Sequence, residues 1–568
     1  MQTPAIDIEA MRLIACVMSV VGWCSACSGA SSGPPSRTTA RCVTLLAAND
    51  VHGSLEPQLR RAGDVSVTVG GLLTMSGYVG VIRARSPHPV VLLDAGDIYQ
   101  GTLVSNRFWG RSVIDVYNAM EFDAAVLGNH EFDFGDAERK DGDLLGVVRA
   151  RVAQAQFPFL TLNVHDRSLQ TMIDWPNTRG SIVIERHGVK VGVIGVSTPQ
   201  TPNTTRRENV ASLDFALPPS MVASEAQALR DQGAELVVLL GHLGGACREL
   251  SEPRDPSSCE LDSELFKLIR ALPNGTVDVA IGGHTHQYIA HWYHGVAVLE
   301  AGARAQSLSR VDACVDPTGG IDVATSKIHQ PISLCAQQWR EGGCGPRVTS
   351  TGSIPAAYEG VPIVVDPVVE AAAAPYLAEV EALQNTPLGV ELPYPLKRDG
   401  PHDRNIGALI AEGLARTVSG GLAIQNRGGV RSDLEPGVVT YGDAFEVSPF
   451  GNHVAHLRLK PAQIERLVEL LYRRHSRLPY TRGLAVETDG ERIRVRRGDG
   501  QPWSSQQRYS VATNDYIAFG GDGFGAVMAD EAPHRYRIVL DMTVRDAWVR
   551  VLRERFGNAS QPAGVERQ

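Results

Sequence analysis

The motif Gly128-Asn129-His130-Glu131-Phe132-Asp133 directly follows a short apolar run at residues 124–127, and this pairing decides the fold. A run of four to eight apolar residues that ends in glycine, asparagine or aspartate predicts a buried strand leading into a tight loop. Four other segments have the same form: residues 43–48 before Asn49-Asp50-Val51-His52-Gly53, 90–93 before Asp94-Ala95-Gly96-Asp97, 236–240 before Gly241-His242, and 277–281 before Gly282-Gly283-His284-Thr285-His286. The repetition predicts that polar side chains gather at strand ends along the rim of a sheet.

These strand ends carry residue types that bind metal ions. In an extended segment residues i and i+2 point to the same side, so Asp50 with His52, and His284 with His286, can each converge on one ion. The candidate ligands are carboxylates, a carboxamide and imidazoles, with no cysteine among them. Such a set suits Zn, Mn, Co or Mg, and it favours a catalytic centre over a structural zinc site.

The number of ligands predicts two divalent ions. Two nearby cations need a shared anionic ligand, which offsets their repulsion and holds them about 3.5–4 Å apart. Asp97 is the best candidate for this bridge. We expect the remaining ligands to divide into a first group, Asp50, His52 and His286, and a second group, Asn129, His242 and His284. A water shared by both ions would lose a proton and become the nucleophile.

His130 is left without a metal in this assignment. Asp133, three residues further on, would orient its imidazole, and His130 would face the substrate as a charge stabiliser or proton donor. Each residue also has a simpler interpretation, because a strand-end histidine is more often structural and Asp97 or Asp133 could cap a helix. Five of the 16 histidines in matching contexts favour the metal centre.

The composition is that of a globular protein with more than one domain. The chain has 568 residues, which is too many for one ordinary core. A net charge of -9 argues against binding of a nucleic acid polymer, so a phosphate partner must be bound locally. The apolar stretch near the N-terminus is too short to span a bilayer as a stable helix, and no other apolar run reaches that length.

The N-terminus resembles a secretory signal peptide. Met11-Arg12 precedes an apolar stretch at residues 13–23, and a run of small and turn-forming residues follows at 27–35. Translation could begin at Met11. Cys27 could accept a lipid anchor, although Cys24 stands where an aliphatic residue is normal. We therefore expect an exported protein, periplasmic or extracellular, with a lipoprotein as the variant form.

The cysteines fit an exported protein. Three of the nine lie in or beside the segment expected to be removed. Local disulfides are expected between Cys247 and Cys259 and between Cys335 and Cys344, with free buried thiols as the alternative. Cys42 and Cys314 are left without an obvious local partner.

We expect a two-domain α/β protein. Strands alternate with helical stretches to about residue 303, including helices at 221–232, capped by Ser220, and at 261–272. An alanine-rich helix at 366–385 reads as a connector, and a second α/β region has helices at 405–418 and 461–474 and strands near 422–425 and 509–512. The expected boundaries are 1–41 for the signal peptide and flexible N-terminal segment, 42–362 for the catalytic domain, 363–387 for the connecting helix, 388–557 for the substrate-binding domain and 558–568 for a disordered tail.

The five strand-end motifs, in this order, resemble the calcineurin-like metallophosphoesterases. That resemblance implies a four-layer α/β/β/α catalytic domain and the ligand roles given above. The Phe132-Asp133 pair and the second domain indicate the branch of 5'-nucleotidases and UDP-sugar hydrolases. The resemblance covers nearly the whole mature chain.

The second domain carries three further segments that resemble this branch: Asn426-Arg427-Gly428-Gly429-Val430-Arg431, Ser448-Pro449-Phe450-Gly451-Asn452, and Thr513-Asn514-Asp515-Tyr516-Ile517-Ala518-Phe519-Gly520-Gly521-Asp522-Gly523-Phe524. A base stacked between Phe450 and Tyr516 would gain energy with little dependence on its identity. The expected polar contacts are Asp522 with ribose hydroxyls, Asn426 and Asn452 with the base, and Arg431 with a phosphate. As core residues, Phe450 and Tyr516 would have no such role, and Asp522 could merely stabilise its turn.

The chain also departs from the family pattern. Arg427 stands where relatives commonly have glycine, which suggests an extra positive charge near the phosphates. Tyr516 adds a hydroxyl where some relatives have phenylalanine. A further phosphate-binding arginine is expected before Asn405, and either Arg398 or Arg404 could supply it.

The leading hypothesis is an exported dinuclear-metal phosphohydrolase that releases phosphate from nucleoside 5'-monophosphates. UDP-sugars and 2',3'-cyclic nucleotides are further candidate substrates. One alternative is a sulfur-oxidation enzyme of the same architecture with a dimanganese site. Another is a non-catalytic nucleotide-binding protein, which predicts damaged ligands.

Overall fold

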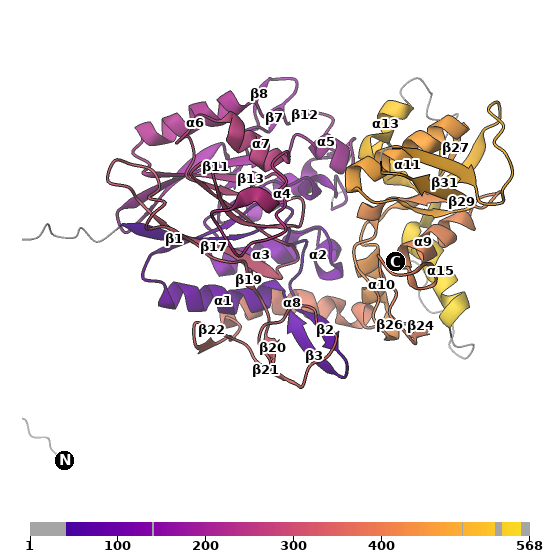
Figure 1. Ribbon diagram of the computed structural model, residues 1–568, viewed down its shortest axis with the longest axis horizontal. Coiled ribbons are helices and arrows are strands. Elements are labelled where there is room, and N and C mark those ends of the chain that lie inside the picture. Colours follow the sequence, from indigo (N-terminus) through magenta and orange to yellow (C-terminus); the bar gives the residue numbers. More distant parts are fainter. Residues whose placement is uncertain (1–40, 139–140, 491, 529–536, 558–568) are drawn as a thin grey trace, which may run out of the picture. The chain divides into compact units, whose positions relative to one another are not determined.

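A computed structural model describes residues 41–138, 141–490, 492–528 and 537–557 of the chain (Figure 1). The expected signal peptide and Cys27, within residues 1–40, and the expected tail at 558–568 lie outside the described residues. Within the described part, no helix has both the length and the apolar character needed to cross a membrane.

Two sheets form the centre of the N-terminal domain. The larger has eight strands in the order β18 (Lys327–Ile328), β17 (Ser307–Cys314), β1 (Cys42–Ala48), β4 (Val90–Asp94), β5 (Ala124–Val126), β6 (Phe159–Leu160) and β9 (Thr178–Arg179), with β19 (Ile332–Ser333) also paired to β17. The six-stranded sheet has the order β10 (Ser181–Arg186), β11 (Val189–Ser197), β13 (Leu236–His242), β14 (Val279–Ile281), β16 (Val296–Ala301) and β15 (Tyr288–Tyr293).

Alternation along β1 shows how the layers are built. Leu45 and Ala47 belong to an apolar core shared with strands of the six-stranded sheet, whereas Leu46 and Ala48 face a core shared with helices. The helices of that core are α1 (Leu72–Arg85), α3 (Arg111–Met120), α4 (Gly146–Gln154) and α8 (Pro367–Gln384). A third core joins the far face of the six-stranded sheet to α6 (Pro219–Asp231) and α7 (Glu264–Ala271). The expected α/β/β/α layering is confirmed.

Shorter elements complete this domain. Two are short helices, α2 (Leu103–Arg107) and α5 (Thr201–Thr204). The others are small antiparallel pairings: β2 (Gln58–Ala62) with β3 (Val65–Val69), β7 (His165–Asp166) with β8 (Thr171–Met172) and β12 (Leu213–Asp214), β20 (Gln337–Trp339) with β21 (Ser353–Pro355), and β22 (Ala357–Tyr358) with β23 (Val361–Pro362).

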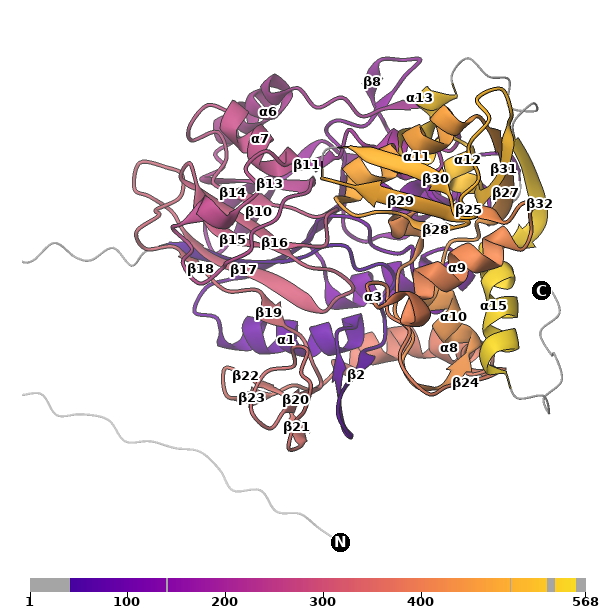
Figure 2. The same ribbon diagram turned by 45° about the vertical axis from the view of Figure 1, so that its right-hand side comes forward.

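The C-terminal domain is built on a five-stranded sheet in the order β28 (Tyr480–Arg482), β25 (Leu422–Gln425), β31 (Tyr509–Asn514), β27 (His453–Leu459) and β32 (Arg537–Thr543). One face packs on α9 (Ile406–Ala415) and α15 (Val544–Phe556), and the other on α11 (Pro461–His475) and α12 (Asp515–Ala518), as Figure 2 shows. The remaining elements are β24 (Pro387–Leu392) paired with β26 (Gly437–Thr440), β29 (Leu484–Thr488) paired with β30 (Ile493–Arg497), α10 (Tyr441–Val447) and α13 (Phe524–Val527).

Two expected helix starts were wrong. Helix α6 begins at Pro219, and Ser220 lies inside it without a capping role, because proline at the first position already fixes a helical φ. Helix α7 begins at Glu264, after Ser263, rather than at residue 261. The connector helix α8 has the expected start, with the Asp366 side chain accepting a hydrogen bond from the backbone N–H of Val368.

Three disulfides are present among the described residues. The expected pairs Cys247–Cys259 and Cys335–Cys344 are confirmed. Cys42 and Cys314, for which the sequence offered no local partner, bond to each other because β1 and β17 are antiparallel neighbours that place the two residues opposite one another. A separation of 272 residues hid this pairing from the sequence.

Loss of the Cys42–Cys314 bond should lower stability more than loss of a local bond. A cross-link restricts the unfolded chain more when it closes a longer loop, so we expect the Cys42→Ser/Cys314→Ser variant to lose about 2–4 kcal/mol of unfolding free energy. The matched control is Cys335→Ser/Cys344→Ser, whose cysteines are 9 residues apart. The unfolding free energies of both variants are measured by denaturant unfolding. An equal loss of unfolding free energy in the control variant would contradict this expectation.

Candidate functional site

The strand ends named in the sequence analysis meet at one rim. Strands β1, β4 and β5 are parallel neighbours in the larger sheet, and β13 and β14 are parallel neighbours in the other. Because parallel strands end at the same edge of a sheet, the loops that follow them converge between the two sheets. Asp50, Asp97, Asn129 and His242 are buried there.

The backbone is strained at this rim. Asp50, His52, Asp97, His284 and His286 all have positive φ angles, between 50° and 79°. A side chain makes this conformation unfavourable by about 1–3 kcal/mol per residue, and it persists only where the surroundings enforce it. Five such residues at one place indicate a functional site.

The first of the two groups consists of Asp50, His52 and His286, whose candidate ligand atoms lie within 4.8 Å of one another. His52 Nδ1 is 2.8 Å from the carbonyl oxygen of Gln100, which can only accept, so Nδ1 carries the proton and Nε2 a lone pair. His52 Nε2 lies 3.0 Å from His286 Nε2. Asp50 Oδ1 is buried, has no hydrogen-bond partner among the described residues, and lies 3.3 Å from His286 Nε2.

The second group contains Asp97, His242 and His284, with the same limit on their spacing. His242 Nδ1 is 2.8 Å from the carbonyl oxygen of Ala95, so Nδ1 carries a proton and Nε2 is the ring atom that faces the group. Burial lowers the pKa of His242, but Asp97 outweighs burial and raises this pKa to about 10, so a bound ion would take the place of a proton at Nε2. This nitrogen lies 3.2 Å from Asp97 Oδ2 and 3.1 Å from Asn129 Oδ1. The structure thus brings together the residues expected to bind each ion.

Both groups fit divalent cations. Buried lone pairs and carboxylate oxygens that face one another at such distances repel unless positive charge lies among them. Imidazole, carboxylate and carboxamide donors suit the ions expected from the sequence. Two bound divalent ions would supply Lewis acidity and would ionise a bound water at neutral pH.

Asp97 faces both groups with a single oxygen. Its Oδ2 is 3.2 Å from His242 Nε2 and 3.9 Å from His52 Nε2. Burial raises the pKa of Asp97, but His242 and His130 outweigh burial and hold that pKa well below its usual range. The side chain is therefore a carboxylate in the position expected of a bridge.

Glu131 holds Asp97 in place, a role that the sequence did not suggest. Its carboxylate accepts hydrogen bonds from the backbone N–H groups of Asp97 (2.9 Å), Ile98 (2.8 Å) and Gly128 (2.7 Å). Burial and the charge of Asp97 raise the pKa of Glu131 to about 7. A charged residue inside the motif at 128–133, between two ligand-bearing strands, was the signal for this role.

Glu300 supports the histidine loop in the same way and was also missed. Its Oε1 accepts hydrogen bonds from Thr285 Oγ1 (2.8 Å) and Gln287 N (3.2 Å), on either side of His286. Its Oε2 accepts from Gly245 N (3.3 Å). The only sequence signal is an acidic residue inside an apolar strand.

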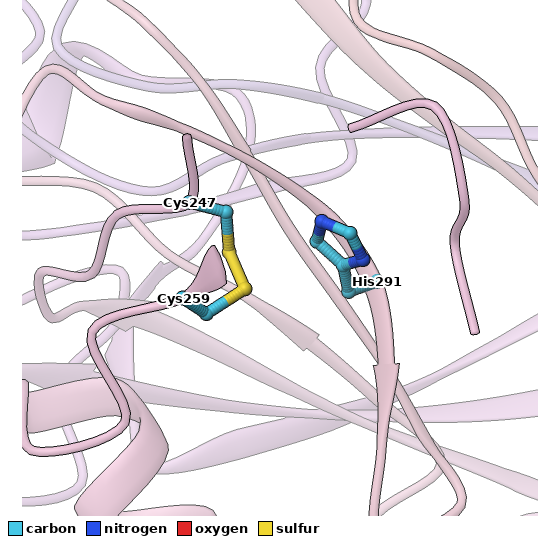
Figure 3. A group of neighbouring side chains, drawn as sticks. All are labelled: Cys247, Cys259 and His291. Atoms are coloured by element: carbon cyan, nitrogen blue, oxygen red, sulfur yellow. A yellow bond between two sulfur atoms is a disulfide. The ribbon is translucent and has the colours of Figure 1, made fainter. Parts of the chain in front are cut away.

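A third cluster with metal-binding residue types has another explanation. Cys247, Cys259 and His291 lie close together, but Figure 3 shows the two sulfur atoms joined in a disulfide. His291 Nε2 is 2.7 Å from the carbonyl oxygen of Glu249. Because thiolates are the ligands that such a site needs, the disulfide leaves it without them.

His130 lies beside the metal groups and is oriented by Asp133. Its Nδ1 is 2.6 Å from Asp133 Oδ2, and Thr205 Oγ1 donates to the other carboxylate oxygen at 2.7 Å. Burial lowers the pKa of His130, but Asp133 and Asp97 outweigh burial and raise it. The ring also lines a cleft shared with the C-terminal domain, so it can hold a proton near a substrate.

That cleft, of about 1260 Å³, contains the aromatic residues expected to bind a base. Phe450 lies with its ring centre 5.7 Å from that of His130. Tyr516 lines the same cleft, and its hydroxyl donates to the carbonyl oxygen of Asn203 at 2.7 Å. Asn452 is also in the lining.

Asn426 and Asp522 form a buried network. Asn426 Nδ2 donates to Asp522 Oδ2 at 3.0 Å, and its own Oδ1 accepts from Asn514 (2.9 Å) and Gln425 (3.1 Å). The side chains are therefore occupied with each other, whereas we expected them to contact the base and the ribose.

Arg431 reaches the metal groups from the C-terminal domain. Its Nη2 lies 3.0 Å from His52 Nε2, and its guanidinium carbon lies 5.7 Å from the centre of the Phe450 ring. Burial, with repulsion from Arg304, lowers the pKa of Arg431 to about 10, so it remains a cation at neutral pH. This is where a phosphate-binding arginine is expected.

The other arginines are placed differently. Arg427 donates to Asp399 (2.7 Å) and stacks on Tyr480 at 4.6 Å. Its charge is therefore paired with Asp399 and not directed at the metal groups. Arg404 stacks on Tyr394 at 4.4 Å. Arg398 lines a second cleft together with Arg431, whereas Arg404 is not among the residues of that lining, so Arg398 is the better placed of the two candidates. Its guanidinium also pairs with Asp433 at 3.3 Å.

Comparison with known proteins agrees with this geometry. Residues 43–288 match the calcineurin-like phosphoesterase family, and residues 392–530 match the 5'-nucleotidase C-terminal domain. Protein UshA of Yersinia enterocolitica is 23% identical over 512 residues, covering 85% of this chain and 86% of its own length. The crystal structure of a 5'-nucleotidase precursor from Thermus thermophilus is 24% identical, with a TM-score of 0.72, and covers 92% of this chain and 98% of its own. The sulfate thiohydrolase SoxB from Thermus thermophilus is 17% identical with a TM-score of 0.67, covering 91% and 95% of the two chains.

The fold and the site define a calcineurin-like metallophosphoesterase, a class that uses a dinuclear divalent metal centre. With its second domain, the chain belongs to the 5'-nucleotidase family. It is a metal-dependent phosphoric ester hydrolase.

The pair His130 and Asp133 makes a testable prediction about pH. If protonated His130 assists the reaction, activity falls as pH rises through its pKa. Asp133→Asn removes the charge that raises this pKa, so the alkaline fall in kcat should move to lower pH. The matched control is Asp136→Asn, which makes the same change at a carboxylate that accepts from Gly142 N. An unchanged alkaline limb in Asp133→Asn would contradict the assignment.

Proposed function

We propose that this protein is a 5'-nucleotidase that hydrolyses nucleoside 5'-monophosphates to a nucleoside and orthophosphate. The observation that carries the proposal is the single cleft lined by Asp97, His130, Phe450 and Tyr516. A phosphate at the metal groups and a base beside the aromatic rings can therefore belong to one molecule. Zn, Mn, Co and Mg are the candidate ions, with the two ligand groups as their sites.

The residues of the chain supply four functions in this proposal. The two ligand groups hold the ions, and Arg431 binds the phosphate from the opposite side. His130, held by Asp133, donates a proton toward the leaving oxygen or stabilises developing charge. Phe450 and Tyr516 provide stacking surfaces that accept purines and pyrimidines alike.

Phosphate release tests the proposed activity directly. The expected result is turnover of AMP that requires a divalent ion and stops with a chelator, measured with each of Mn, Zn, Co and Mg. UDP-glucose, a 2',3'-cyclic nucleotide and bis(p-nitrophenyl) phosphate extend the assay to the other candidate substrates. No metal-dependent turnover of AMP under any of these conditions would overturn the proposal.

Export is part of the proposal. Three disulfides support an oxidising compartment, because such bonds are rare in the cytosol of most organisms. A periplasmic or extracellular location would follow from the signal-like segment expected at the N-terminus.

The two alternatives have less support. A sulfur-oxidation enzyme shares the fold, but the aromatic pair beside the metal groups favours a ring-containing substrate. A non-catalytic binding protein would be expected to have lost metal-binding residues. Here all the expected metal-binding residues are present: six form the two groups, and Asn129 lies beside His242 of the second group.

Phe450 should matter for nucleotides and much less for substrates that have no ring. Base stacking on an aromatic side chain contributes about 1–3 kcal/mol, so Phe450→Ala should lower kcat/KM for AMP about tenfold or more. Hydrolysis of glycerol 2-phosphate should change by less than about twofold. The matched control is Phe519→Ala, which removes an exposed ring that stacks on Arg537 outside this cleft. Equal losses for both substrates in Phe450→Ala would remove the residue from the base site.

A further inference from the structure

The C-terminal end of α11 and the two residues after it bring three arginines to the nucleotide cleft. The segment is Arg473-Arg474-His475-Ser476-Arg477, and all five residues line the cleft. Arg473 lies 2.9 Å from Glu469, on its own helix. Arg477 donates to Asp399 at 2.6 Å. Arg474 instead extends toward Asp522, the residue expected to bind the ribose.

Arg474 meets Asp522 in an ion pair. Its Nε lies 3.1 Å from Asp522 Oδ1. Because the inner nitrogen of the guanidinium makes this contact, the two terminal nitrogens remain available to a ligand in the cleft that Arg474 lines. The exposed fraction of the Arg474 side chain is 27%, compared with 5% for Asp522. A ligand at this position therefore meets the arginine more than the carboxylate.

Asp522 shares its acceptor sites with protein donors, which leaves fewer of them for ribose hydroxyls. The Tyr516 hydroxyl, whose proton is directed at the Asn203 carbonyl oxygen, lies 3.2 Å from Asp522 Oδ1 and accepts from Asp522 N at 3.2 Å. Oδ2 accepts from Asn426 Nδ2 at 3.0 Å. Arg474 also offsets the charge of the carboxylate. The chemistry offered to the ribose is thus donor-rich and cationic, which suits an anionic group better than a hydroxyl that must donate.

We propose that Arg474 is a specificity-determining residue that favours nucleoside 5'-monophosphates carrying a second phosphate on the ribose 2'- or 3'-oxygen. A planar guanidinium can donate two hydrogen bonds to one phosphate, and both its charge and its geometry fit that group. The inference rests on the proposed 5'-nucleotidase function and specifies its substrate class. The reaction at the metal groups is unchanged, because water still releases the 5'-phosphate and leaves a nucleoside 2'- or 3'-phosphate.

The placement of the cleft residues supports this substrate. Phe450 and Tyr516, which would hold the base, line the same cleft as Asp97 and His284 of the metal groups. The ribose joins these two parts of a nucleotide. Asp522, which Tyr516 and Asn426 hold in place, marks the side of the cleft at which Arg474 meets the ribose.

Comparison of AMP with adenosine 3',5'-bisphosphate and adenosine 2',5'-bisphosphate tests the inference. Products are separated by chromatography, so that loss of the 5'-phosphate is distinguished from loss of the ribose phosphate. For the wild-type holoenzyme we expect kcat/KM for one bisphosphate to exceed that for AMP by about tenfold or more, as a charge-assisted contact allows. Removal of the ribose phosphate in place of the 5'-phosphate would overturn the inference.

Variants on α11 identify the residue responsible. In Arg474→Gln, the ratio of kcat/KM for the preferred bisphosphate to kcat/KM for AMP should fall to about one. Arg474→Lys keeps the charge and should retain part of the preference. The matched control is Arg466→Gln, which changes a half-exposed arginine of the same helix that pairs with Glu469 and does not line the cleft, and this variant should keep the wild-type ratio. Melting temperature and metal content are measured for each variant to establish that it is folded and loaded.

The outcomes separate the inference from the function on which it rests. Hydrolysis of AMP with a wild-type ratio near one, or a ratio that persists in Arg474→Gln, overturns the role of Arg474 and leaves the 5'-nucleotidase proposal standing. Equal losses of both substrates in Arg474→Gln assign the residue to the 5'-phosphate or to the fold, and also overturn it. Absence of metal-dependent product from all three nucleotides overturns the function and the inference together.

Discussion

The structure depends on one buried carboxylate, that of Asp97, held between two groups of metal-binding side chains. Asp97 is 1% exposed, and Asp50 beside it is fully buried. Glu131 contacts the backbone of Asp97 from behind. So many acidic groups away from water are costly unless cations compensate them. The burial of these carboxylates, and the positive φ angles of five residues, both occur where the strands end.

Hydrogen bonds to the backbone keep the arrangement rigid, and most of them come from residues that are not ligands. Glu131 binds three backbone N–H groups next to Asp97 and Asn129, and Glu300 binds the loop that carries His284 and His286. The carbonyl groups of Gln100 and Ala95 accept from Nδ1 of His52 and His242, so that Nε2 of each ring faces the metal groups. The geometry of the site is therefore determined by the layered fold, and ligand side chains are free to face inward.

The C-terminal domain completes the site through a few direct contacts. Arg431 reaches His52, and Arg304 Nη2 donates to the Arg431 carbonyl oxygen at 2.6 Å. The Tyr516 hydroxyl, which the sequence marked only as a departure, bonds to Asn203 in the catalytic domain. These contacts bring Arg431 to the metal groups and the Tyr516 ring to the cleft that those groups line. In the proposed function, the chemistry and the substrate selection come from different domains that share this cleft.

The layered architecture, all five strand-end motifs and two disulfides could be predicted from the sequence, because apolar runs and glycine-flanked ligands are local signals. Features set by distant residues could not. Cys42 meets Cys314 only through strand pairing, and the charge of Arg427 is paired with that of Asp399, which lies 28 residues away. Asn426 and Asp522 bind each other, although their motifs suggested contacts with a ligand. A motif indicates which residues lie close together, but not which of their polar atoms remain available to a ligand.

The central claim, that Asp97 joins two ions into one centre, is tested most directly by counting metal. Purified protein is loaded with Mn, dialysed and analysed for metal per chain, and the electron paramagnetic resonance spectrum is recorded. We expect about two ions per wild-type chain with an exchange-coupled signal, because a shared carboxylate holds the ions about 3.5–4 Å apart. Asp97→Asn should bind fewer ions and show only uncoupled Mn. Two coupled ions in Asp97→Asn, or a single ion in the wild-type protein, would contradict the account.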